Sequence, residues 1–243
     1  MQESSAVPPG RAGRSDQSLI CSVPAVLPPF SNTGVESGDV GLSWLGGTIR
    51  SDDGEGVGWG LTRRLGGPST LTGSTVHYRA GVRADDWSWS VMWGGMGGAV
   101  GTVYATIRQS YLERVGSDGL ALARDLLRDG YLASSRVDLA GDDLRGSGPR
   151  PRWYFDRRAE AWTRTQRGRW QFTEQGSGSQ TLYVGSRSSD RMLRLYDHAP
   201  SVLRHELELK GVVAAGVGVA LGSGASVADL WAAEYGRLVR WAA

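Results

Sequence analysis

Acids, arginines and a tyrosine recur at alternate positions in three short segments of the sequence, at 136–142, 192–198 and 204–208. Successive side chains of a β-strand point to opposite faces, so residues two apart share one face. If the three segments are neighbouring strands, one sheet face collects carboxylates, guanidinium groups, a phenol and an imidazole. The polar residues on that face are Arg136, Asp138, Asp142, Arg194, Tyr196, His198, Arg204, Glu206 and Glu208.

Such a face could carry out metal-assisted phosphoryl transfer. Carboxylate oxygens are ligands that Mg²⁺ and Mn²⁺ prefer, and a metal with arginines would neutralise a phosphodiester and its developing charge. A tyrosine oxygen could attack phosphorus and hold DNA covalently, and rejoining would need no ATP. The spacing alone leaves a second interpretation open, in which cross-strand ion pairs cover a solvated face.

The elements that must position these residues follow from hydrophobic periodicity and turn residues. Leu203, Leu207 and Leu209 alternate with the acids of their strand and are expected to face a core. The expected elements are a hairpin of 87–93 with 100–108, a helix at 118–129, a strand at 135–143, a hairpin at 181–197, a strand at 202–210 and a helix at 226–240. This order predicts an α+β fold, with helices packed on one face of a mostly antiparallel sheet and the catalytic residues on the other.

The N-terminal third differs in composition from the rest of the chain. Five of the nine prolines lie in the first 30 residues, and residues 41–75 are rich in Gly, Ser and Thr. We therefore expect 1–75 to be a flexible or weakly structured leader, and 76–243 to be the domain that carries the site.

A row of tryptophans lies on the first expected strand. Trp87, Trp89 and Trp93 alternate with Ser88, Ser90 and Met92. One interpretation is a platform for stacked bases. Packing against a helix is the commoner role of such a row, and we favour it.

Charge and composition exclude several classes of protein. The formal net charge of +2 does not indicate nucleic-acid binding, yet 145–170 holds eight arginines against Asp156 and Glu160. This stretch predicts contact with a DNA backbone, or else a solvated connection. The single cysteine, Cys21, excludes an intrachain disulfide, and the Gly-rich run 211–228 is a poor membrane span. We expect a cytoplasmic protein with no membrane partner.

The stretch TLYVGSRSSDRMLRLYDH (Thr181–His198) resembles the signature of the replication initiation factor family. That pattern runs GSR-x-S-x-x-x-x-R-x-Y-[DE]-K and is followed by R-x-E, which Arg204 and Glu206 match. Upstream, Arg136, Asp138, Ala140 and Asp142 match a family strand of the type R-x-D-x-A-x-D. The family comprises initiators of pT181-type rolling-circle plasmids, with relatives among filamentous phages and relaxases.

The resemblance implies a nicking and closing enzyme for rolling-circle replication at a plasmid or phage origin. Its tyrosine cleaves one strand, leaving a 5′-phosphotyrosine and a 3′-OH that a host polymerase extends. The alternatives are a relaxase of an integrative element and a non-catalytic DNA-binding relative. The resemblance further implies double- and single-stranded origin DNA as partners and Mg²⁺ or Mn²⁺ as cofactor, and it allows a host helicase and a homodimer.

The resemblance also assigns roles by position. Tyr196 is the nucleophile, and Arg194 and Arg204 hold the scissile phosphate. His198 joins the catalytic set in place of the family lysine, which is a departure because histidine is charged only part of the time near neutral pH. The implied metal ligands are Asp138, Glu206, Asp142 and Glu208, and the implied DNA-binding residues are Arg187, Arg191, Arg152, Arg157 and Arg158.

Overall fold

The computed structural model describes residues 40–143, 150–163, 169–199 and 202–240. Ten strands of this part form one antiparallel sheet in the order β2-β3-β4-β5-β1-β6-β11-β10-β9-β8. Their bounds are β1 Val40–Arg50, β2 Ser69–Thr72, β3 Tyr78–Ala84, β4 Trp89–Gly95, β5 Thr102–Arg108, β6 Ala133–Asp143, β8 Trp170–Glu174, β9 Gln180–Val184, β10 Arg191–Ala199 and β11 Val202–Lys210. Two short strands, β7 Trp162–Thr163 and β12 Val239–Arg240, pair separately.

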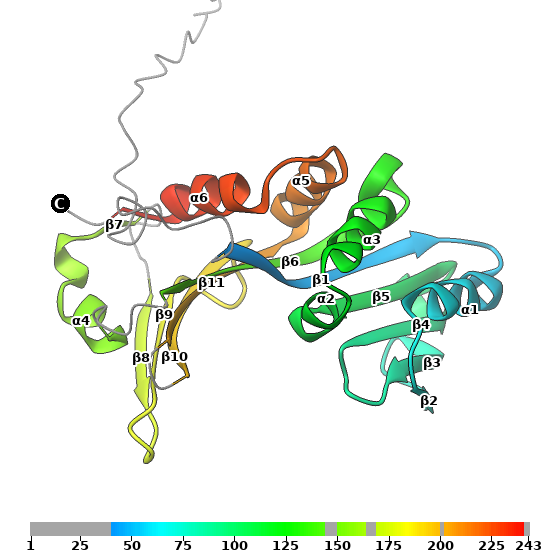
Figure 1. Ribbon diagram of the computed structural model, residues 1–243, viewed down its shortest axis with the longest axis horizontal. Helices are drawn as coiled ribbons and strands as arrows, with labels where there is room; N and C mark the ends of the chain where they lie inside the picture. Colours follow the sequence, from blue (N-terminus) through cyan, green and yellow to red (C-terminus); the bar gives the residue numbers. More distant parts are fainter. Residues whose placement is uncertain (1–39, 144–149, 164–168, 200–201, 241–243) are drawn as a thin grey trace, which may run out of the picture.

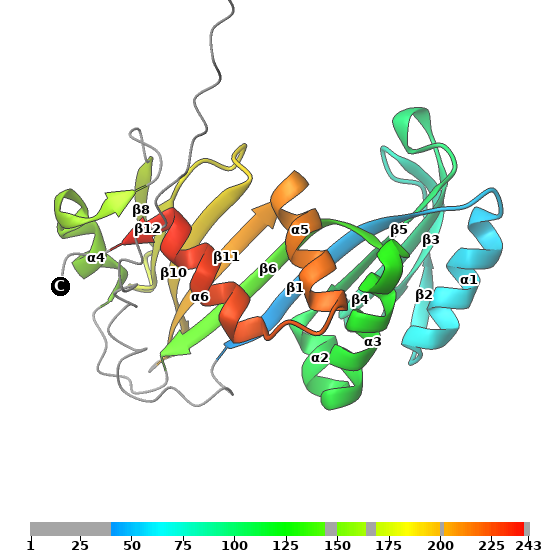
Figure 2. The ribbon, with the colours of Figure 1, turned by 90° about the horizontal axis from the view of Figure 1, so that it is seen from above.

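The helices gather over one face of this sheet, as Figures 1 and 2 show. They are α1 Gly54–Leu65, α2 Gln109–Val115, α3 Ser117–Leu127, α4 Pro151–Asp156, α5 Gly211–Gly222 and α6 Val227–Leu238. The sheet residues beneath them are apolar and buried, and Leu45, Leu139 and Leu207 are 4% exposed or less. We call this side of the sheet the helix face. The α+β class and the one-sided packing predicted from the sequence are confirmed.

The opposite side of the sheet, which we call the polar face, carries the alternate residues of the same strands. On β11 the leucines at 203, 207 and 209 alternate with Arg204, Glu206 and Glu208, and every one of these side chains is buried. The strand is therefore central in the sheet, with helices over one side and neighbouring polar side chains around its residues on the other. Because neighbouring strands each contribute residues to the polar face, the site is assembled across the sheet rather than along one segment.

The boundary expected at residue 75 is wrong for part of the leader. Residues 40–75 hold β1, α1 and β2, and β1 lies at the centre of the sheet between β5 and β6. Glycines obscured its alternation, and glycine is needed at position 47 because a Cβ there would lie 2.6 Å from the Ala133 carbonyl oxygen. Residues 1–39 lie outside the described part of the chain.

The tryptophan row belongs mainly to the core, as favoured from the sequence. Trp89 and Trp93 are buried on the helix face, and Trp93 lies 5.3 Å from Trp59 of α1 between ring centroids. Trp87 departs from the row because it precedes β4 with a φ of 60°, and it is 53% exposed. Its ring lies under the Arg83 guanidinium at 3.4 Å.

The Gly-rich run near the C-terminus forms α5, and Ser226 caps α6 by accepting a hydrogen bond from the Asp229 amide at 3.4 Å. Among the described residues, no helix has the length and apolar character needed to cross a bilayer.

Candidate active site

The three chemistry-bearing segments are neighbours in the sheet, in the order β6, β11, β10. Across β10 and β11, Arg194 pairs with Glu206 and Tyr196 pairs with Arg204. Across β11 and β6, Glu208 pairs with Asp138 and Arg204 with Asp142. The shared face predicted from the period of two therefore exists, and its residues meet in register.

Tyr196 lies beside Glu206 on this face. Its hydroxyl donates a hydrogen bond to Glu206 Oε2 at 3.0 Å, and its ring is half-buried. Burial and then the Glu206 carboxylate raise the pKa of Tyr196 to about 12, although Arg204 opposes the rise. Exposed His198 lies on the same strand, with its ring centroid 5.9 Å from that of Tyr196 and nearly perpendicular to it. The carboxylate is thus placed to accept the proton of the phenol.

Two arginines flank the phenol and differ in how firmly they are held. Arg204 donates to both oxygens of Asp142 at 2.6 Å and to Gln109 Oε1 at 2.6 Å, so its guanidinium is fixed. Arg194 donates to Glu206 Oε1 at 2.9 Å and to Asp138 Oδ2 at 3.4 Å. Its buried Nε has no hydrogen-bond partner among the described residues. Buried donors normally have an acceptor, so this N–H is free to take a phosphate oxygen.

The carboxylates expected to bind metal are paired with cations instead. Arg136 donates to both oxygens of Asp138, at 2.9 and 2.6 Å, and lies 3.0 Å from Glu208. Lys210 also forms an ion pair with Glu208, and Asp142 is occupied by Arg204. Within the described ranges, no group of three or more His, Cys, Asp or Glu is arranged to hold a metal ion. The oxygens suit Mg²⁺ chemically, but as arranged they do not fit it.

The pKa shifts of these acids reflect burial opposed by the cations. Burial raises the pKa of Asp138, while its hydrogen bond with Arg136 lowers it. For Glu208 burial also acts upward, but the hydrogen bond from Lys210 and the charge of Arg136 outweigh it, so its pKa is lowered. Burial therefore prevails at Asp138, whose pKa rises to about 6, whereas the neighbouring cations prevail at Glu208.

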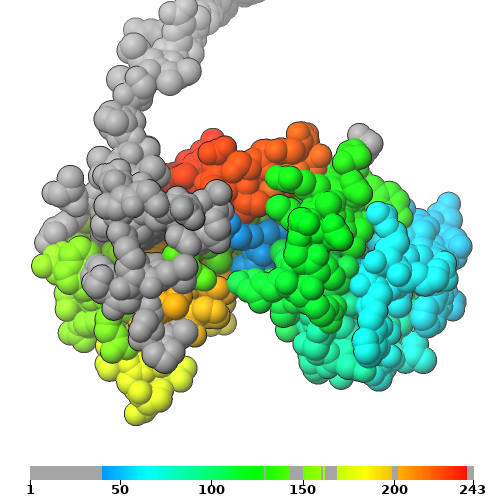
Figure 3. All heavy atoms as spheres, viewed as in Figure 1, coloured from blue at the N-terminus to red at the C-terminus, as the bar shows by residue number. Residues whose placement is uncertain are grey.

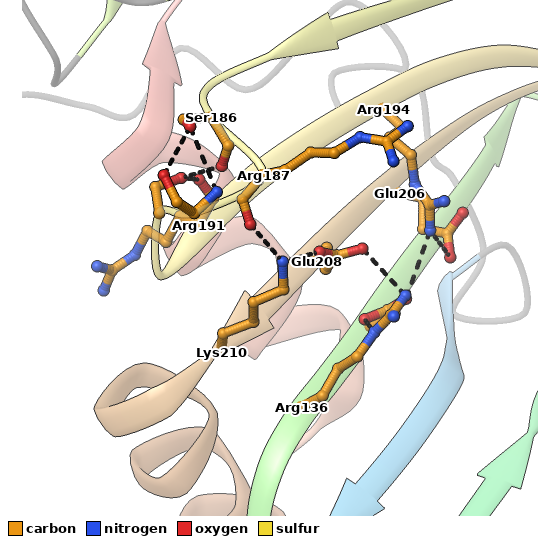
Figure 4. A network of polar contacts seen from close by, with 11 residues as sticks. Arg136, Ser186, Arg187, Arg191, Arg194, Glu206, Glu208 and Lys210 are labelled. Atoms are coloured by element: carbon orange, nitrogen blue, oxygen red, sulfur yellow. Dashed lines mark hydrogen bonds and ion pairs between the residues drawn. The ribbon is translucent and has the colours of Figure 1, made fainter. Parts of the chain in front are cut away.

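The GSRSS motif forms a tight turn between β9 and β10. Gly185 has a φ of 106°, which favours glycine, and the Ser189 hydroxyl donates to the Ser186 carbonyl at 2.7 Å. Arg187 is exposed on this turn, 5.8 Å from the Tyr183 ring, and its carbonyl accepts from Lys210 Nζ at 2.7 Å. Figure 4 shows Lys210 reaching from β11 to this turn. The motif thus links the exposed arginine to the carboxylate row.

Arg191 does not lie on the polar face, contrary to its expected DNA-binding role. It is an odd-numbered residue of β10, so it points to the helix face, where its Nε donates to Glu234 Oε2 of α6 at 2.7 Å. Figure 4 shows its guanidinium directed away from Arg194 and Glu206. Its side chain is 18% exposed. The ion pair ties α6 to the sheet, and this accounts for the arginine without DNA.

The arginines expected to bind DNA on α4 and just after it form a separate exposed group at the end of the sheet. Arg152 pairs with Asp156 at 2.9 Å, Arg157 lies 4.3 Å from the Trp153 ring and Arg158 lies 4.2 Å from the Phe155 ring. They take no part in the polar contacts of Tyr196. Three other arginines of the basic stretch, Arg145, Arg164 and Arg167, lie outside the described residues.

Several site residues were not anticipated, and most of them belong to β1 or to the junction of β5 and α2. Ser43 donates to Glu206 Oε1 at 3.2 Å, and Trp44 lies between the guanidinium groups of Arg108 and Arg136, at 4.8 and 4.9 Å. A register shift between Leu42 and Trp44 leaves Leu42 buried and brings Ser43 to the polar face beside Trp44. An irregularity of this kind breaks the period of two, so alternation in the sequence could not reveal it.

Of the comparisons with known proteins, the one with solved structures finds this architecture again. No family model matches the chain, and no curated protein matches it in sequence. The structure is similar to that of the rolling circle replication initiator protein from Geobacillus stearothermophilus, with a TM-score of 0.67 and 16% sequence identity over 84% of this chain and 87% of that one. The chain therefore has the fold of a rolling-circle replication initiator, as its sequence resemblance implied.

Proposed function

We propose that this protein initiates rolling-circle replication by nicking and rejoining one DNA strand through Tyr196. The observation that carries the proposal is the Tyr196 hydroxyl, hydrogen-bonded to Glu206 at 3.0 Å with Arg194 and Arg204 beside it. The likeness in fold to an initiator supports the same function. The alternative, a face of cross-strand ion pairs without catalysis, does not require a tyrosine hydroxyl hydrogen-bonded to a carboxylate.

In the proposed reaction, Tyr196 Oη attacks the phosphorus of one phosphodiester and the bond from phosphorus to O3′ breaks. Glu206 accepts the phenol proton, and the leaving O3′ takes a proton from water. The products are a 5′-phosphotyrosine and a free 3′-OH, and the reverse attack rejoins the strand. Arg194 and Arg204 stabilise charge on the phosphoryl oxygens, while proton transfer to Glu206 contributes about 10²–10⁴ in rate.

The divalent metal, Mg²⁺ or Mn²⁺, stays a prediction. When bound it would neutralise charge on the phosphate, but the carboxylates must first exchange their arginine and lysine partners. His198 is exposed beside Tyr196 near the end of β10, and its part in the reaction stays a prediction. Origin DNA, a host helicase, a homodimer and a cytoplasmic location likewise remain predictions.

A covalent-capture experiment tests the proposal without knowledge of the origin. The protein is incubated with a library of single-stranded oligonucleotides of random sequence, with Mg²⁺, with Mn²⁺ or with a chelator. Denatured complexes are isolated, and the linked peptide is identified by mass spectrometry. We expect an adduct on Tyr196 and a recurring sequence at the linked 5′ ends. Tyr183→Phe is the matched control, because Tyr183 pairs with Arg194 from the adjacent strand β9.

The expected result is loss of the adduct in Tyr196→Phe and its retention in Tyr183→Phe. Undiminished linkage in Tyr196→Phe would reject the nucleophile. Salt-sensitive DNA binding without an adduct under any metal condition would instead favour the non-catalytic relative. A relaxase would give the same adduct, and a neighbouring gene for a coupling ATPase distinguishes that role.

A further inference from the structure

We propose that the polar face holds a second nucleotide-binding subsite, built by β1, β3, β4 and β5, which takes an unpaired nucleotide of the DNA strand nicked at Tyr196. Its parts are an open cavity for the base and a cluster of donors at Gly46 for the phosphate. The assignment of DNA as the ligand rests on the proposed function. The cavity and the donors are observed independently of it.

The cavity lies at the β3–β5 side of the sheet and has a volume of about 830 Å³. Tyr78 and Tyr104 line it with rings 6.2 Å apart between centroids and 24° from parallel, and Met92 lies beside them. Arg50 and His77 contribute exposed polar groups. The described lining contains no Asp or Glu. An aromatic and apolar lining with cations and no acids suits a base with its phosphate.

The position of Tyr78 and Tyr104 is fixed by the residues around them. The Tyr78 hydroxyl lies 3.0 Å from Thr102 Oγ1, which anchors the first ring. The Tyr104 hydroxyl lies over Gly46, where an added Cβ would stand 2.7 Å from it. Burial raises the pKa of Tyr104, and Arg136 opposes the rise, so this phenol lies between the cavity and the carboxylate row. Glycine at position 46 makes room for the hydroxyl.

Donors without acceptors gather at the same place. A Cβ on Gly46 would also lie 3.1 Å from Trp44 Nε1, so this indole N–H adjoins the Tyr104 hydroxyl. Trp44 Nε1 and Arg108 Nε are buried and have no hydrogen-bond partner among the described residues. The Trp44 ring also lies between Arg108 and Arg136, at 4.8 and 4.9 Å. Two unsatisfied donors, the Trp44 indole N–H and Nε of the Arg108 guanidinium, with the Arg136 guanidinium on the same indole ring, predict an anionic acceptor.

The subsite is separated from Tyr196 by more than one nucleotide step. Trp44 lies on β1, where it pairs with Asp138 of β6. β1 is three strand spacings from β10, the strand of Tyr196, and this separation is about 14 Å measured across the sheet. This exceeds the roughly 3.4 Å rise per nucleotide in a duplex strand. In Figure 3 the molecule is hollowed on its lower side, between the yellow and orange strands and the green helices. The same strand can therefore reach both places along one face.

Equilibrium binding of fluorescent oligothymidylate tests the subsite, and it is measured in the Tyr196→Phe background so that no adduct forms. We expect Tyr104→Ala to weaken binding about tenfold, since base–aromatic stacking contributes on this scale. Gly46→Ala should weaken it because the new methyl displaces the Tyr104 hydroxyl and Trp44 Nε1. Gly41→Ala is the matched control on β1, because a Cβ there meets nothing within 4 Å. A blunt duplex hairpin should be insensitive to all three changes.

Photo-crosslinking of the unaltered protein to iodouracil-substituted oligonucleotide provides a measurement that needs no variant. Cross-links at Tyr78, Met92 or Tyr104 support the subsite. Unchanged binding in Tyr104→Ala and Gly46→Ala, or cross-links confined to other residues, overturns it, even if the Tyr196 adduct forms. If the unaltered protein forms no adduct but binding still depends on Tyr104, the nicking proposal is rejected and the subsite stands as a single-strand binding site.

Discussion

The hydroxyl of Tyr196 on β10 donates a hydrogen bond to Glu206 on the adjacent strand β11 over 3.0 Å. In the resting site this bond keeps the phenol protonated, because the carboxylate, after burial, raises the pKa of Tyr196 to about 12. In the reaction proposed above, the same carboxylate accepts the phenol proton once a phosphate binds. The pair would then keep Tyr196 protonated without DNA and activate it when DNA is bound.

Glu206→Gln should separate these two effects. Removing the carboxylate should lower the pKa of Tyr196 from about 12, but not fully to its ordinary 10.0, because burial is the larger cause and remains. Tyrosine ring-carbon NMR during a pH titration measures this shift. Adduct formation should nevertheless fall about 10²–10⁴-fold, since the proton acceptor is lost.

Glu174→Gln on β8 is the matched control for this variant, because Glu174 is exposed and outside the Tyr196 network. It should leave both the pKa and the adduct yield unchanged. A Tyr196 pKa that does not move in Glu206→Gln would contradict the role assigned to the pair.

A metal ion and the guanidinium groups should compete for the same oxygens. Arg136 occupies Asp138 and Glu208, at 2.6 and 3.0 Å. We expect Arg136→Gln to tighten Mn²⁺ binding by roughly tenfold, or about 1.4 kcal/mol, because it removes one cation from each carboxylate and leaves Asp138 with Arg194 and Glu208 with Lys210. Titration calorimetry measures the affinity. Arg150→Gln, which breaks the ion pair with Asp197, is the control and should leave the Mn²⁺ affinity unchanged. Equal affinities in the unaltered protein, Arg136→Gln and Arg150→Gln would show that Arg136 does not compete with the metal.

The sequence predicted the polar face because its determinants are local. Alternation places Asp138, Glu206 and Tyr196 on one side of each strand whatever the rest of the fold does. Neighbouring strands were an assumption at that level, and the sheet order β6-β11-β10 satisfies it. Arg191 of β10 does not share that face, because its odd position along the strand points it to the helix face. Applying the period of two to the basic residues would have excluded it.

The contribution of β1 could not be predicted in the same way. Its pairing with β5 and β6 joins residues about 60 and 95 positions apart, as in Trp44 with Arg108 and Asp138. No local pattern encodes such contacts, and the register shift beside Trp44 breaks the alternation that might have marked the strand. Ser43, Trp44 and Gly46 were therefore invisible, although two of them touch the site through Glu206 and Arg136.

Two glycines of α1 should respond oppositely to the same substitution. A Cβ on Gly58 would lie 2.5 Å from the Trp93 ring, whereas a Cβ on Gly60 meets nothing within 4 Å. We expect Gly58→Ala to lower the free energy of unfolding by about 1–3 kcal/mol through overpacking. Gly60→Ala should raise it by about 0.5–1 kcal/mol, because alanine favours the helix. Urea denaturation measures both, and similar stabilisation by both substitutions would mean that α1 does not pack on β4.

The buried histidine of β11 should make the fold sensitive to acid. His205 is completely buried, lies 3.3 Å from the Tyr235 hydroxyl through Nδ1, and has a pKa lowered to about 3 by burial. The unfolded chain binds a proton near pH 6.5 and the folded chain does not, so stability is full above pH 6.5 and falls as the pH drops toward 3. Between pH 6.5 and 4.5 the free energy of unfolding should fall by about 2–3 kcal/mol through this residue.

His205→Gln cannot titrate, so its free energy of unfolding in urea should lose this part of the pH dependence. His198→Gln, at an exposed position, should keep it. Parallel profiles for the unaltered protein and His205→Gln would show that His205 is protonated in the folded state.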